Sequence, residues 1–455
     1  MGLFAFALSR LFLVMAEIRS FRALRYDPEL TPLELVLTQP YDKISPRMQA
    51  EYYERSPHNL VRYELGQSKP HDNDAENVYT RARDFLRDLQ KKSVLRRDTE
   101  PSIYVYRQKF KNPNRPLEHH ERAGFIALGR LHEYDEHVVY PHERTLTGPK
   151  EDRFRLLTTT RTHSGQIFML YDDPAQKVEQ VLSAVAVSRE EDAFVVDEYG
   201  VENRIWRVNE PSLISQVQEH MRDQRLIIAD GHHRYETSLK YRRTSGVDPN
   251  SDAPENFTMM TFVNMAAPGL MILPTHRVLT NSGFDEGTAL ERLQEFFTLL
   301  PRTAASVDPI LAELAEAGRE HTAIAMVTSR GCYLLKAKPD AVNKALHSLT
   351  LLERKLDVAV LHKLIFGKLM QISEKATAEQ KHLTYHRSAQ AAVDDVRAGA
   401  EAAFLLNPVP ISLMRDLTFE GTVMPQKSTD FFPKLLSGLT LYALDAQTAG
   451  TATHR

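Results

Sequence analysis

The sequence predicts a mixed α+β protein, on three observations. Segments 102–107 and 123–129 are short and rich in aromatic, β-branched and other apolar residues, which is typical of strands. Segment 73–92 instead places its apolar residues on one face at helical spacing. Beyond residue 280 the chain becomes helix-rich, with short strand-like runs between the helical stretches. We therefore expect a second, helix-rich α+β region there; one continuous fold is the alternative.

The same patterns predict the elements in order. Four prolines exclude a long helix over residues 22–66 and favour strands and turns, namely Pro28, Pro32, Pro40 and Pro46. Later strands are expected at 102–107, 123–129, 166–171, 204–208, 226–229, 257–264, 332–336 and 403–407. Helices are expected at 73–92, 150–161, 175–188, 211–224, 341–371 and 387–400, and over most of 283–330. The charged segment 109–122 is interpreted as a solvated, hairpin-like connection.

Composition limits the partners. The 455-residue chain carries 57 basic and 60 acidic residues, a net charge of −3. Such a balance gives no general field for nucleic acid or a membrane surface, so we expect neither partner, and any anion binding must be local. Cys332 is the only cysteine, which excludes an internal disulfide and fits a reducing compartment, so a cytoplasmic protein is expected. We interpret Cys332 as a buried core thiol.

The first fifteen residues are apolar, but Arg10 interrupts them and they are too short to span a bilayer. An upstream start codon, with Met15 opening the protein, is favoured over an export signal. The expected division is an N-terminal extension at 1–20, an anion-binding catalytic region at 21–280, a C-terminal α+β region at 281–441 and a flexible tail at 442–455.

Segment 227–237 carries the clearest chemical signal. An apolar strand ends at Ala229, Asp230 and Gly231 turn the chain, and a helix can begin at His232. Glycine permits positive φ and a close ligand, while the first turn of a helix offers free N–H groups to phosphate or carboxylate. Arg234 would bind an oxyanion through two parallel hydrogen bonds. Asp230 would cap the helix, orient a histidine or help hold a divalent ion.

A purely structural reading of this segment is the alternative. Asp-Gly is a common turn, and paired histidines often decorate a surface. His232 and His233 point roughly 100° apart on a helix, so they seldom ligate one metal together. Four polar side chains directly after a buried strand nevertheless favour an anion site.

Segment 142–145 supplies an imidazole, a carboxylate, a guanidinium and a hydroxyl in four consecutive residues, His142, Glu143, Arg144 and Thr145. The Glu143 carboxylate would accept the proton of an attacking hydroxyl or hold Mg²⁺, and Arg144 would balance negative charge. A solvated polar loop is the alternative.

Further polar groups are weighed in the same way. Lys150 and Arg153 lie one helical turn apart and can face one ligand, although such residues are usually solvated. His276 and Arg277 follow a proline-fixed turn and would close a pocket or form a structural ion pair. The segment Lys427-Ser428-Thr429 has the donors of a phosphate loop but lacks its glycines. The pair Tyr41-Asp42 is equally explained by turn chemistry.

The segment ADGHHRYET, residues 229–237, resembles the marker of domain-of-unknown-function family 1015. Further matching segments run in order from about residue 20 to 440, at 21–27, 39–42, 140–145, 273–277, 424–429 and 432–434. One departure is Gln426, where proline is expected. The resemblance names no activity.

The strand–DGHHR–helix segment is also similar to the phosphate-binding motif of the ParB and sulfiredoxin superfamily. That resemblance covers about a dozen residues. It implies a ParB/sulfiredoxin-like strand–turn–helix core and phosphoryl chemistry on a small hydroxyl metabolite, with serine or phosphoserine the favoured substrate.

The leading hypothesis is therefore a phosphotransferase or phosphatase that uses Mg²⁺, with a nucleotide or pyrophosphate as donor; the oligomeric state is not predicted. Its catalytic residues would be Glu143, Asp230, His232 and His233, of which Glu143 and Asp230 are also the candidate metal ligands. Its phosphate-binding residues would be Gly231, His232, His233, Arg234, Arg144, Thr145, Arg153, Arg277 and Lys427. Its substrate-binding residues would be Tyr41, Asp42, His142, His276 and Thr429. The alternatives are a non-catalytic nucleotide-binding regulator with a ParB-like site and a metal-dependent hydrolase built from Asp230, His232 and Glu143.

Overall fold

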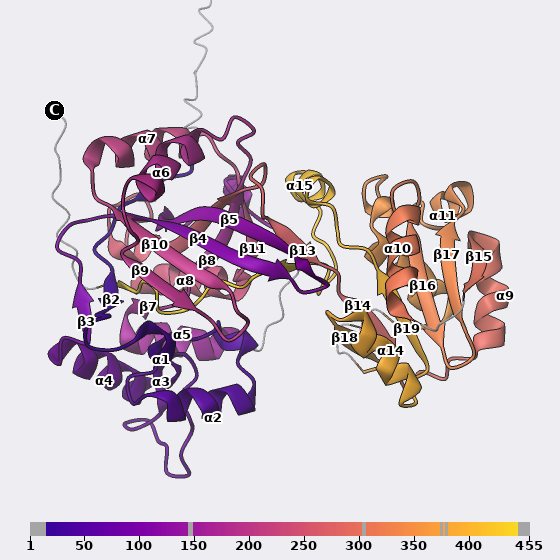
Figure 1. Ribbon diagram of the computed structural model, residues 1–455, viewed down its shortest axis with the longest axis horizontal. Coiled ribbons are helices and arrows are strands. Elements are labelled where there is room, and N and C mark those ends of the chain that lie inside the picture. The colour runs from indigo at the N-terminus through magenta and orange to yellow at the C-terminus, as the bar shows by residue number, and fades with distance from the viewer. Residues whose placement is uncertain (1–14, 144–148, 303–305, 374–375, 378–380, 445–455) are drawn as a thin grey trace, which may run out of the picture.

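Two β-sheets organise the chain into a large and a small lobe (Figure 1). The computed structural model describes residues 15–143, 149–302, 306–373, 376–377 and 381–444. A nine-stranded sheet forms the centre of the large lobe and a six-stranded sheet the centre of the small lobe. Helices cover both sheets, so the predicted mixed α+β class is confirmed.

The large sheet is mixed in direction. β11 runs parallel to β6, and β12 runs parallel to β8, while the other pairs are antiparallel. Its strands, in spatial order, are β6 (Val139–Pro141), β11 (Leu226–Asp230), β8 (Ile167–Tyr171), β12 (Phe257–Asn264), β5 (Arg115–Arg130), β4 (Ile103–Asn112), β10 (Glu202–Val208) and β9 (Ala193–Val196), with β1 (Ile18–Arg19) on β5. The segment 109–122, expected as a solvated, hairpin-like connection, continues the β4–β5 ladder up to a turn at residues 113–114.

Alternate residues of these strands face two different cores. Ile103 and Val105 pack in one core with helices α6 (Lys177–Ser188) and α7 (Pro211–Met221). Tyr104 and Tyr106 face the opposite core, which includes residues of α4 (Val78–Lys91) and α5 (Pro149–Thr160). This period-2 alternation explains why β4 was recognisable in the sequence.

The N-terminal region is more helical than expected. Strands β2 (Leu24–Tyr26) and β3 (Leu95–Arg97) form a small ladder, and the segment between them folds into α1 (Leu33–Val36), η1 (Tyr41–Lys43), α2 (Pro46–Arg55), α3 (Val61–Glu64) and α4. The expectation of strands and turns is wrong for α2. Pro46 occupies the first helical position, where a missing N–H costs nothing, and the Ser45 hydroxyl accepts the N–H of Met48 at 3.2 Å.

The small-lobe sheet is antiparallel, in the order β15 (Phe297–Arg302), β17 (Cys332–Ala337), β16 (Ala323–Thr328), β19 (Ala402–Leu406), β14 (His276–Leu279) and β18 (Leu383–His386). One core contains residues of α10 (Val307–Ala317) and α14 (Ala389–Arg397). The opposite core contains residues of α9 (Glu286–Phe296), α11 (Pro339–Ala345), α12 (Asp357–Val360) and η5 (Leu361–Leu369). Cys332 is buried in this sheet, as expected, and burial raises the pKa of its thiol to about 11.

Strands β15 and β16 lie in the stretch 283–330, where mostly helix was expected. β16 is buried at every position, so it has no polar alternation, and an apolar run of that kind cannot be told from a buried helix by periodicity. β15 follows α9 directly, with no glycine or proline between them to mark the change.

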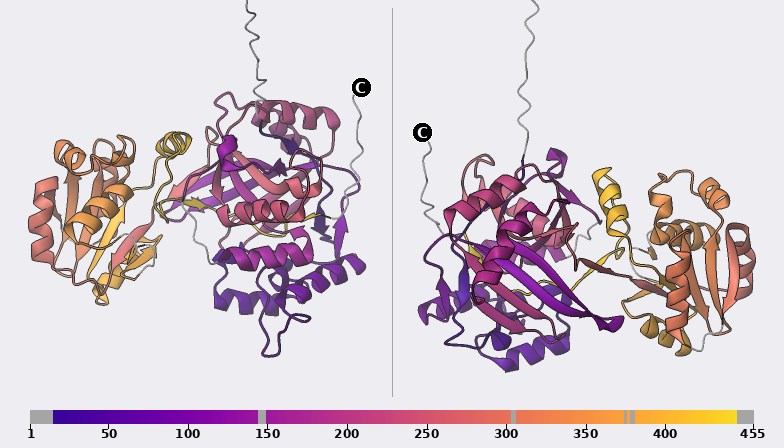
Figure 2. Two further views of the ribbon diagram at one scale, coloured as in Figure 1. Left: turned by 180° about the vertical axis from the view of Figure 1, so that it is seen from behind. Right: turned by 45° about the horizontal axis from the view of Figure 1, so that its top comes forward.

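The C-terminal segment returns from the small lobe to the large one. Helix α15 (Ile411–Phe419) sits between the lobes, and the chain then crosses back (Figure 1, Figure 2). There β20 (Asp430–Phe432) pairs with β13 (Met271–Leu273), and β21 (Tyr442–Ala443) pairs with β7 (Thr162–His163). Two chain connections thus join the lobes. The division at residue 280 remains a proposal.

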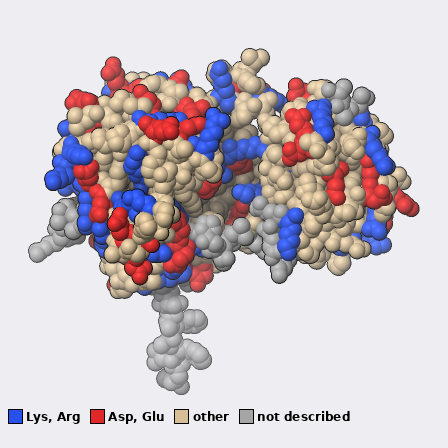
Figure 3. Space-filling model, turned by 90° about the horizontal axis from the view of Figure 1, so that it is seen from below, with Lys and Arg blue, Asp and Glu red and all other residues tan. Residues whose placement is uncertain are grey.

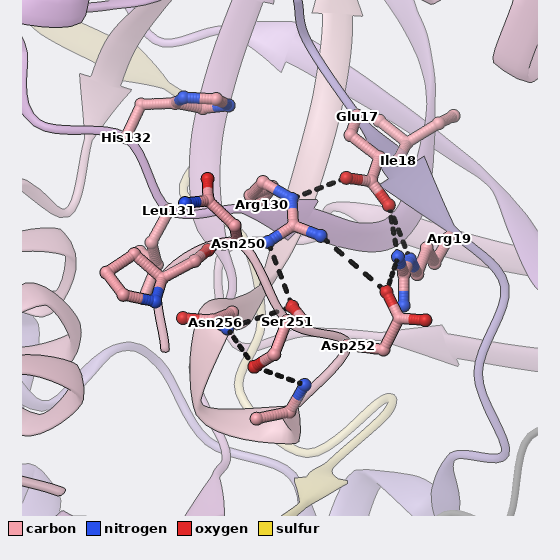
Figure 4. A network of polar contacts seen from close by, with 12 residues as sticks. Glu17, Ile18, Arg19, Arg130, Leu131, His132, Asn250, Ser251, Asp252 and Asn256 are labelled. Atoms are coloured by element: carbon pink, nitrogen blue, oxygen red, sulfur yellow. Dashed lines mark hydrogen bonds and ion pairs between the residues drawn. The ribbon is translucent and has the colours of Figure 1, made fainter. Parts of the chain in front are cut away.

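An ionic network fixes strand β1 at the edge of the large lobe (Figure 4). Arg130 donates to the Glu17 carboxylate, and Arg19 Nη2 lies 2.6 Å from Asp252 Oδ1. Arg130 Nη1 also donates to the Ser251 carbonyl at 3.2 Å. The network ties the start of the described chain to the loop before β12. Within the described ranges, no helix is long and apolar enough to cross a membrane.

Candidate functional site

The strand–turn–helix expected around residue 231 is formed by β11, Gly231 and helix α8 (His232–Ser245). Gly231 precedes the helix with φ of 94°, and no side chain caps the helix start. The Tyr235 N–H makes the first intrahelical bond, to the Gly231 carbonyl at 2.9 Å. The amides ahead of it lie at the positive end of the helix dipole, which suits an anion.

Glycine is favoured at position 231 for two reasons. Its φ lies in the left-handed region, which strains any residue with a Cβ. A Cβ at this position would also lie 3.0 Å from Nε of Arg234. The turn therefore needs glycine both for its backbone angle and for the guanidinium packed against it.

Asp230 is held between two cations. Arg234 Nη2 donates to its Oδ2 at 2.7 Å, and Lys434 Nζ donates to its Oδ1 at 2.9 Å. Burial alone would raise the pKa of Asp230, but the charges of Lys434 and Arg234 outweigh it and hold that pKa well below its ordinary value. Arg234 Nη1 donates to the Gln166 carbonyl. Each terminal nitrogen of Arg234 thus has one protein acceptor and a second N–H besides, so the two parallel bonds to a ligand that we expected remain a prediction.

The charged network extends from Lys434. Its Nζ also lies 3.1 Å from Asp430 Oδ1, and Arg387 pairs with the same Asp430 carboxylate. Burial lowers the pKa of Lys434, but Asp230 and Asp430 more than compensate, so the group is a firmly charged ammonium. Burial and the nearby Lys434 charge lower the pKa of Lys43. Positive charge is therefore concentrated next to the start of α8.

His142 connects β11 to the returning C-terminal segment. Its Nδ1 lies 2.5 Å from the Ile228 carbonyl oxygen, and its Nε2 lies 2.6 Å from Thr429 Oγ1. Burial lowers the pKa of His142 to about 4, so the ring is neutral at pH 7. The His232 ring lies 4.9 Å away between centroids, and its buried Nε2 has no hydrogen-bond partner among the described residues.

The Glu143 carboxyl has a pKa near neutral pH. Burial raises its pKa to about 7, although the Lys427 N–H and the charges of Lys427, Lys434 and Arg277 oppose the shift. Its Oε1 accepts the Lys427 N–H at 2.8 Å. A carboxylate with such a pKa can accept and return a proton at physiological pH.

These groups surround one cavity of about 620 Å³. The walls come from η1, the ends of β6 and β11, the start of α8, the end of β18 and segment 426–434. Both lobes contribute, and the surface is hollowed between them, with Lys and Arg side chains on the walls (Figure 3). This volume accommodates a small metabolite or a nucleotide.

Most of the predicted site residues line this cavity: Tyr41, Asp42, His142, Glu143, Asp230, Gly231, His232, His233, Arg234, Lys427 and Thr429. They come from four separate segments of the chain. Arg144 and Thr145 lie outside the described residues. The functional roles assigned to all of these residues remain proposals.

Three predicted residues lie behind the cavity walls. Arg153 donates to Asp152 and to the Glu64 carbonyl, and its guanidinium lies 4.3 Å from the centroid of the Tyr41 ring. Buried Arg277 donates to the Lys427 carbonyl at 2.8 Å, and burial lowers its pKa to about 10. Buried His276 accepts the Leu406 N–H at 3.2 Å through Nδ1.

The cavity is also lined by residues that the sequence did not predict as site residues, namely Lys43, Ala229, Thr275, Tyr385, His386, Arg387, Gln426, Asp430 and Lys434. A signal existed for Lys434, because a lone lysine within the apolar run Phe431–Leu436 needs a buried partner. No local pattern marks residues 385–387.

The described side chains of the cavity do not form a ready set of metal ligands. Among the residues that the structure describes, no group of three or more His, Cys, Asp or Glu side chains is arranged to hold a metal ion. Both oxygens of Asp230 already accept from cations. Glu143 is the better placed of the two candidate metal ligands, since among the described residues one donor, the Lys427 N–H, is recorded on its carboxylate, at Oε1.

Comparisons with known proteins place the chain in a family. A family model described as "Protein of unknown function (DUF1015)" matches residues 18–359, about three quarters of the chain. No curated protein matches. A free serine kinase variant solved with ADP is 13% identical, with 66% of this chain and 89% of that chain covered at a TM-score of 0.34. SbnI with a C-terminal truncation, from Staphylococcus aureus, is 11% identical, with 69% of this chain and 87% of that chain covered at a TM-score of 0.33. Likenesses at these TM-scores leave the function to be argued from the site.

Proposed function

This chain belongs to the DUF1015 family of proteins of unknown function, and we propose that it transfers a phosphoryl group to or from the hydroxyl of a small metabolite. The observation that carries the proposal is the pairing, in one cavity, of a cationic helix-start pocket with Glu143, whose pKa is about 7. The cytoplasm is the proposed compartment, because a single cysteine fits a reducing environment.

The anion-binding half consists of the first amides of α8 and the lysines around them. Among the described residues, five Lys or Arg side chains and four Asp or Glu side chains line the cavity, and the pKa of one of these acids, Glu143, is raised to about 7. The side chains that line the cavity therefore carry an excess of positive charge, which a phosphate dianion would neutralise. Lys434, fixed by Asp230 and Asp430, is the cation whose position is best defined.

The proton-transfer half is Glu143. In the kinase direction its carboxylate accepts the proton of the attacking hydroxyl, and in the reverse direction the protonated form returns it to the leaving oxygen. A base whose pKa lies near the working pH serves both directions. Serine and phosphoserine are the substrates we propose, on the similarity of the DGHHR segment to a phosphate-binding motif.

A nucleotide or pyrophosphate is the proposed donor, with Mg²⁺ carried on its phosphates. Magnesium commonly binds through one or two carboxylates together with substrate phosphates, so a closed protein cage is not required. Glu143 would be the carboxylate beside the ion. The ion would neutralise phosphate charge during transfer.

An assay of the full chain tests the proposal. Serine is incubated with ATP, ADP or pyrophosphate and Mg²⁺, and phosphoserine is tested separately for hydrolysis, while phosphate binding is measured by calorimetry. We expect turnover in one direction and phosphate binding that Lys434→Met weakens at least tenfold but Lys92→Met, an exposed control, does not. Absence of turnover, with binding unchanged in Lys434→Met, refutes the proposal. Nucleotide binding without turnover favours a regulator, and tightly bound zinc favours a hydrolase.

A further inference from the structure

The two hydrogen bonds of His142, to Ile228 and to Thr429, determine which atom donates the proton in each bond. A carbonyl oxygen only accepts, so His142 Nδ1, 2.5 Å from the Ile228 carbonyl, carries the proton. The neutral ring then has a lone pair on Nε2. The Thr429 hydroxyl, 2.6 Å away, therefore donates its proton to Nε2. An alcohol is thus hydrogen-bonded to a base that a third group orients, which is the arrangement of an activated nucleophile.

The surroundings of Thr429 suit a group that receives phosphate. Thr429 lines the cavity together with Lys434, Lys427 and the start of α8. His232, the first residue of that helix, lies against the His142 ring, and within the part of the chain that the structure describes its buried Nε2 has no hydrogen-bond partner. A phosphoryl group on Thr429 would place negative charge in the cavity that these lysines line.

We propose that Thr429 is the nucleophile of the reaction and carries the phosphoryl group as a covalent phosphothreonine intermediate. This inference rests on the proposed function and adds a second displacement to it. In the first step Thr429 Oγ1 bonds to phosphorus, the bond from phosphorus to the donor oxygen breaks with its electron pair, and the hydroxyl proton moves to His142 Nε2. The donor is a phosphoanhydride or a phosphate monoester.

In the second step the hydroxyl oxygen of the acceptor metabolite, or of water, attacks the phosphorus of phosphothreonine. Its proton passes to Glu143. The bond to Oγ1 breaks, and Oγ1 takes its proton back from His142. His142 therefore takes and returns the proton of Thr429, and Glu143 takes the proton of the acceptor. Each of these two groups thus acts on a different hydroxyl.

A matched control hydroxyl lies next in the chain. Ser428 is buried, and its Oγ donates to the Pro425 carbonyl at 2.5 Å, so it serves the loop and does not line the cavity. If the His142–Thr429 bond merely fastened segment 425–434 in the same way, Ser428→Ala and Thr429→Ala would have similar effects.

The full chain is incubated separately with terminally labelled ATP, ADP and pyrophosphate and with labelled phosphoserine, quenched, digested and examined by peptide mass spectrometry. In the wild type we expect the label on Thr429, and in Thr429→Ser on the serine that replaces it. In Thr429→Ala we expect no label at this position and a turnover that is about 1,000-fold lower. His142→Gln slows labelling roughly 100-fold, and Ser428→Ala does not.

Two outcomes overturn the inference. Turnover without label at Thr429, retained in Thr429→Ala, shows direct transfer and leaves the proposed function standing. Absence of both turnover and label rejects the intermediate together with the reaction, and the phosphate-binding measurement with Lys434→Met then shows separately whether the cavity is an anion site.

Discussion

Two networks of oppositely charged side chains, one at the edge of the large lobe and one in the cavity, have different roles. At the edge, Arg19 and Arg130 bind Glu17 and Asp252, whose carboxylates are 36% and 72% exposed (Figure 4). In the cavity, Lys434 is 8% exposed and lies between two carboxylates. Water and salt screen the first network, whereas the second is fixed by burial.

The two networks differ in how much positive charge remains available to a ligand. At the edge, acids and bases neutralise each other and tie β1 to a loop. In the cavity, Lys43, Lys427 and the uncapped start of α8 add positive charge beyond what the carboxylates neutralise. The buried network is therefore preorganised for an anion, and each variant below tests one part of this contrast.

Lys434→Met should have the largest effect. Removing this ammonium leaves Asp230 and Asp430 buried close together without their shared cation. We expect a loss of about 3–5 kcal/mol in the free energy of unfolding, measured by urea denaturation.

A double variant separates stability from binding. Asp230→Asn in the Lys434→Met background removes one uncompensated charge and should recover part of the stability without restoring phosphate binding. A loss no larger than that of the exposed Lys92→Met control would show that the cavity network behaves like the edge network.

Glu143→Gln should come next, with opposite effects on activity and stability. The pKa of Glu143 is raised from 4.5 to about 7, so the stability it contributes is fully present below pH 4.5 and lost as pH rises to 7. Turnover in the kinase direction should rise with pH through about 7 in the wild type. Gln should lower it roughly 10²–10⁴-fold and raise the free energy of unfolding at pH 8 by about 1–3 kcal/mol. A pH-independent rate would remove Glu143 from the proposed role.

The sequence predicts those parts of the fold and of the site that are formed by single continuous segments. β11, Gly231 and α8 were recognisable because their chemistry lies in one continuous segment. β4, β8 and β12 were found because their strand-forming residues lie in short, bounded runs. The sequence does not predict α2, because prolines such as Pro46 usually interrupt a helix, whereas Pro46 here begins one.

The rest depends on pairing between distant segments. β13 and β20 lie far apart in the sequence, and their pairing is what places Asp430 and Lys434 beside Asp230. Nothing local records such pairing. The sequence also does not show which face of a strand meets a pocket, and Arg277 accordingly supports the Lys427 backbone from behind.

Gly231→Ala should have an intermediate effect that a matched glycine can calibrate. Gly246 follows the other end of α8 with φ of 73°, and a Cβ there meets nothing within 4 Å. Both alanine variants incur left-handed strain of about 1–2 kcal/mol. Only Gly231→Ala also crowds Arg234, so it alone should weaken phosphate binding, by roughly tenfold if one charge-assisted bond is lost. Equal binding in the two variants would argue against a role for the turn in anion recognition.

Asp252→Asn should have the smallest effect and completes the comparison. Its carboxylate is 72% exposed, and the Arg19 hydrogen bond is the main cause that lowers its pKa. An exposed pair of this kind contributes at most about 1 kcal/mol, and salt screens it. We expect a small loss of stability at low ionic strength that disappears in about 1 M salt, with phosphate binding unchanged throughout. Lys434→Met, in contrast, should remain destabilised in salt, because its partners are buried. A salt-insensitive loss in Asp252→Asn would mean that the edge network is as rigid as the cavity, and burial would no longer distinguish the two.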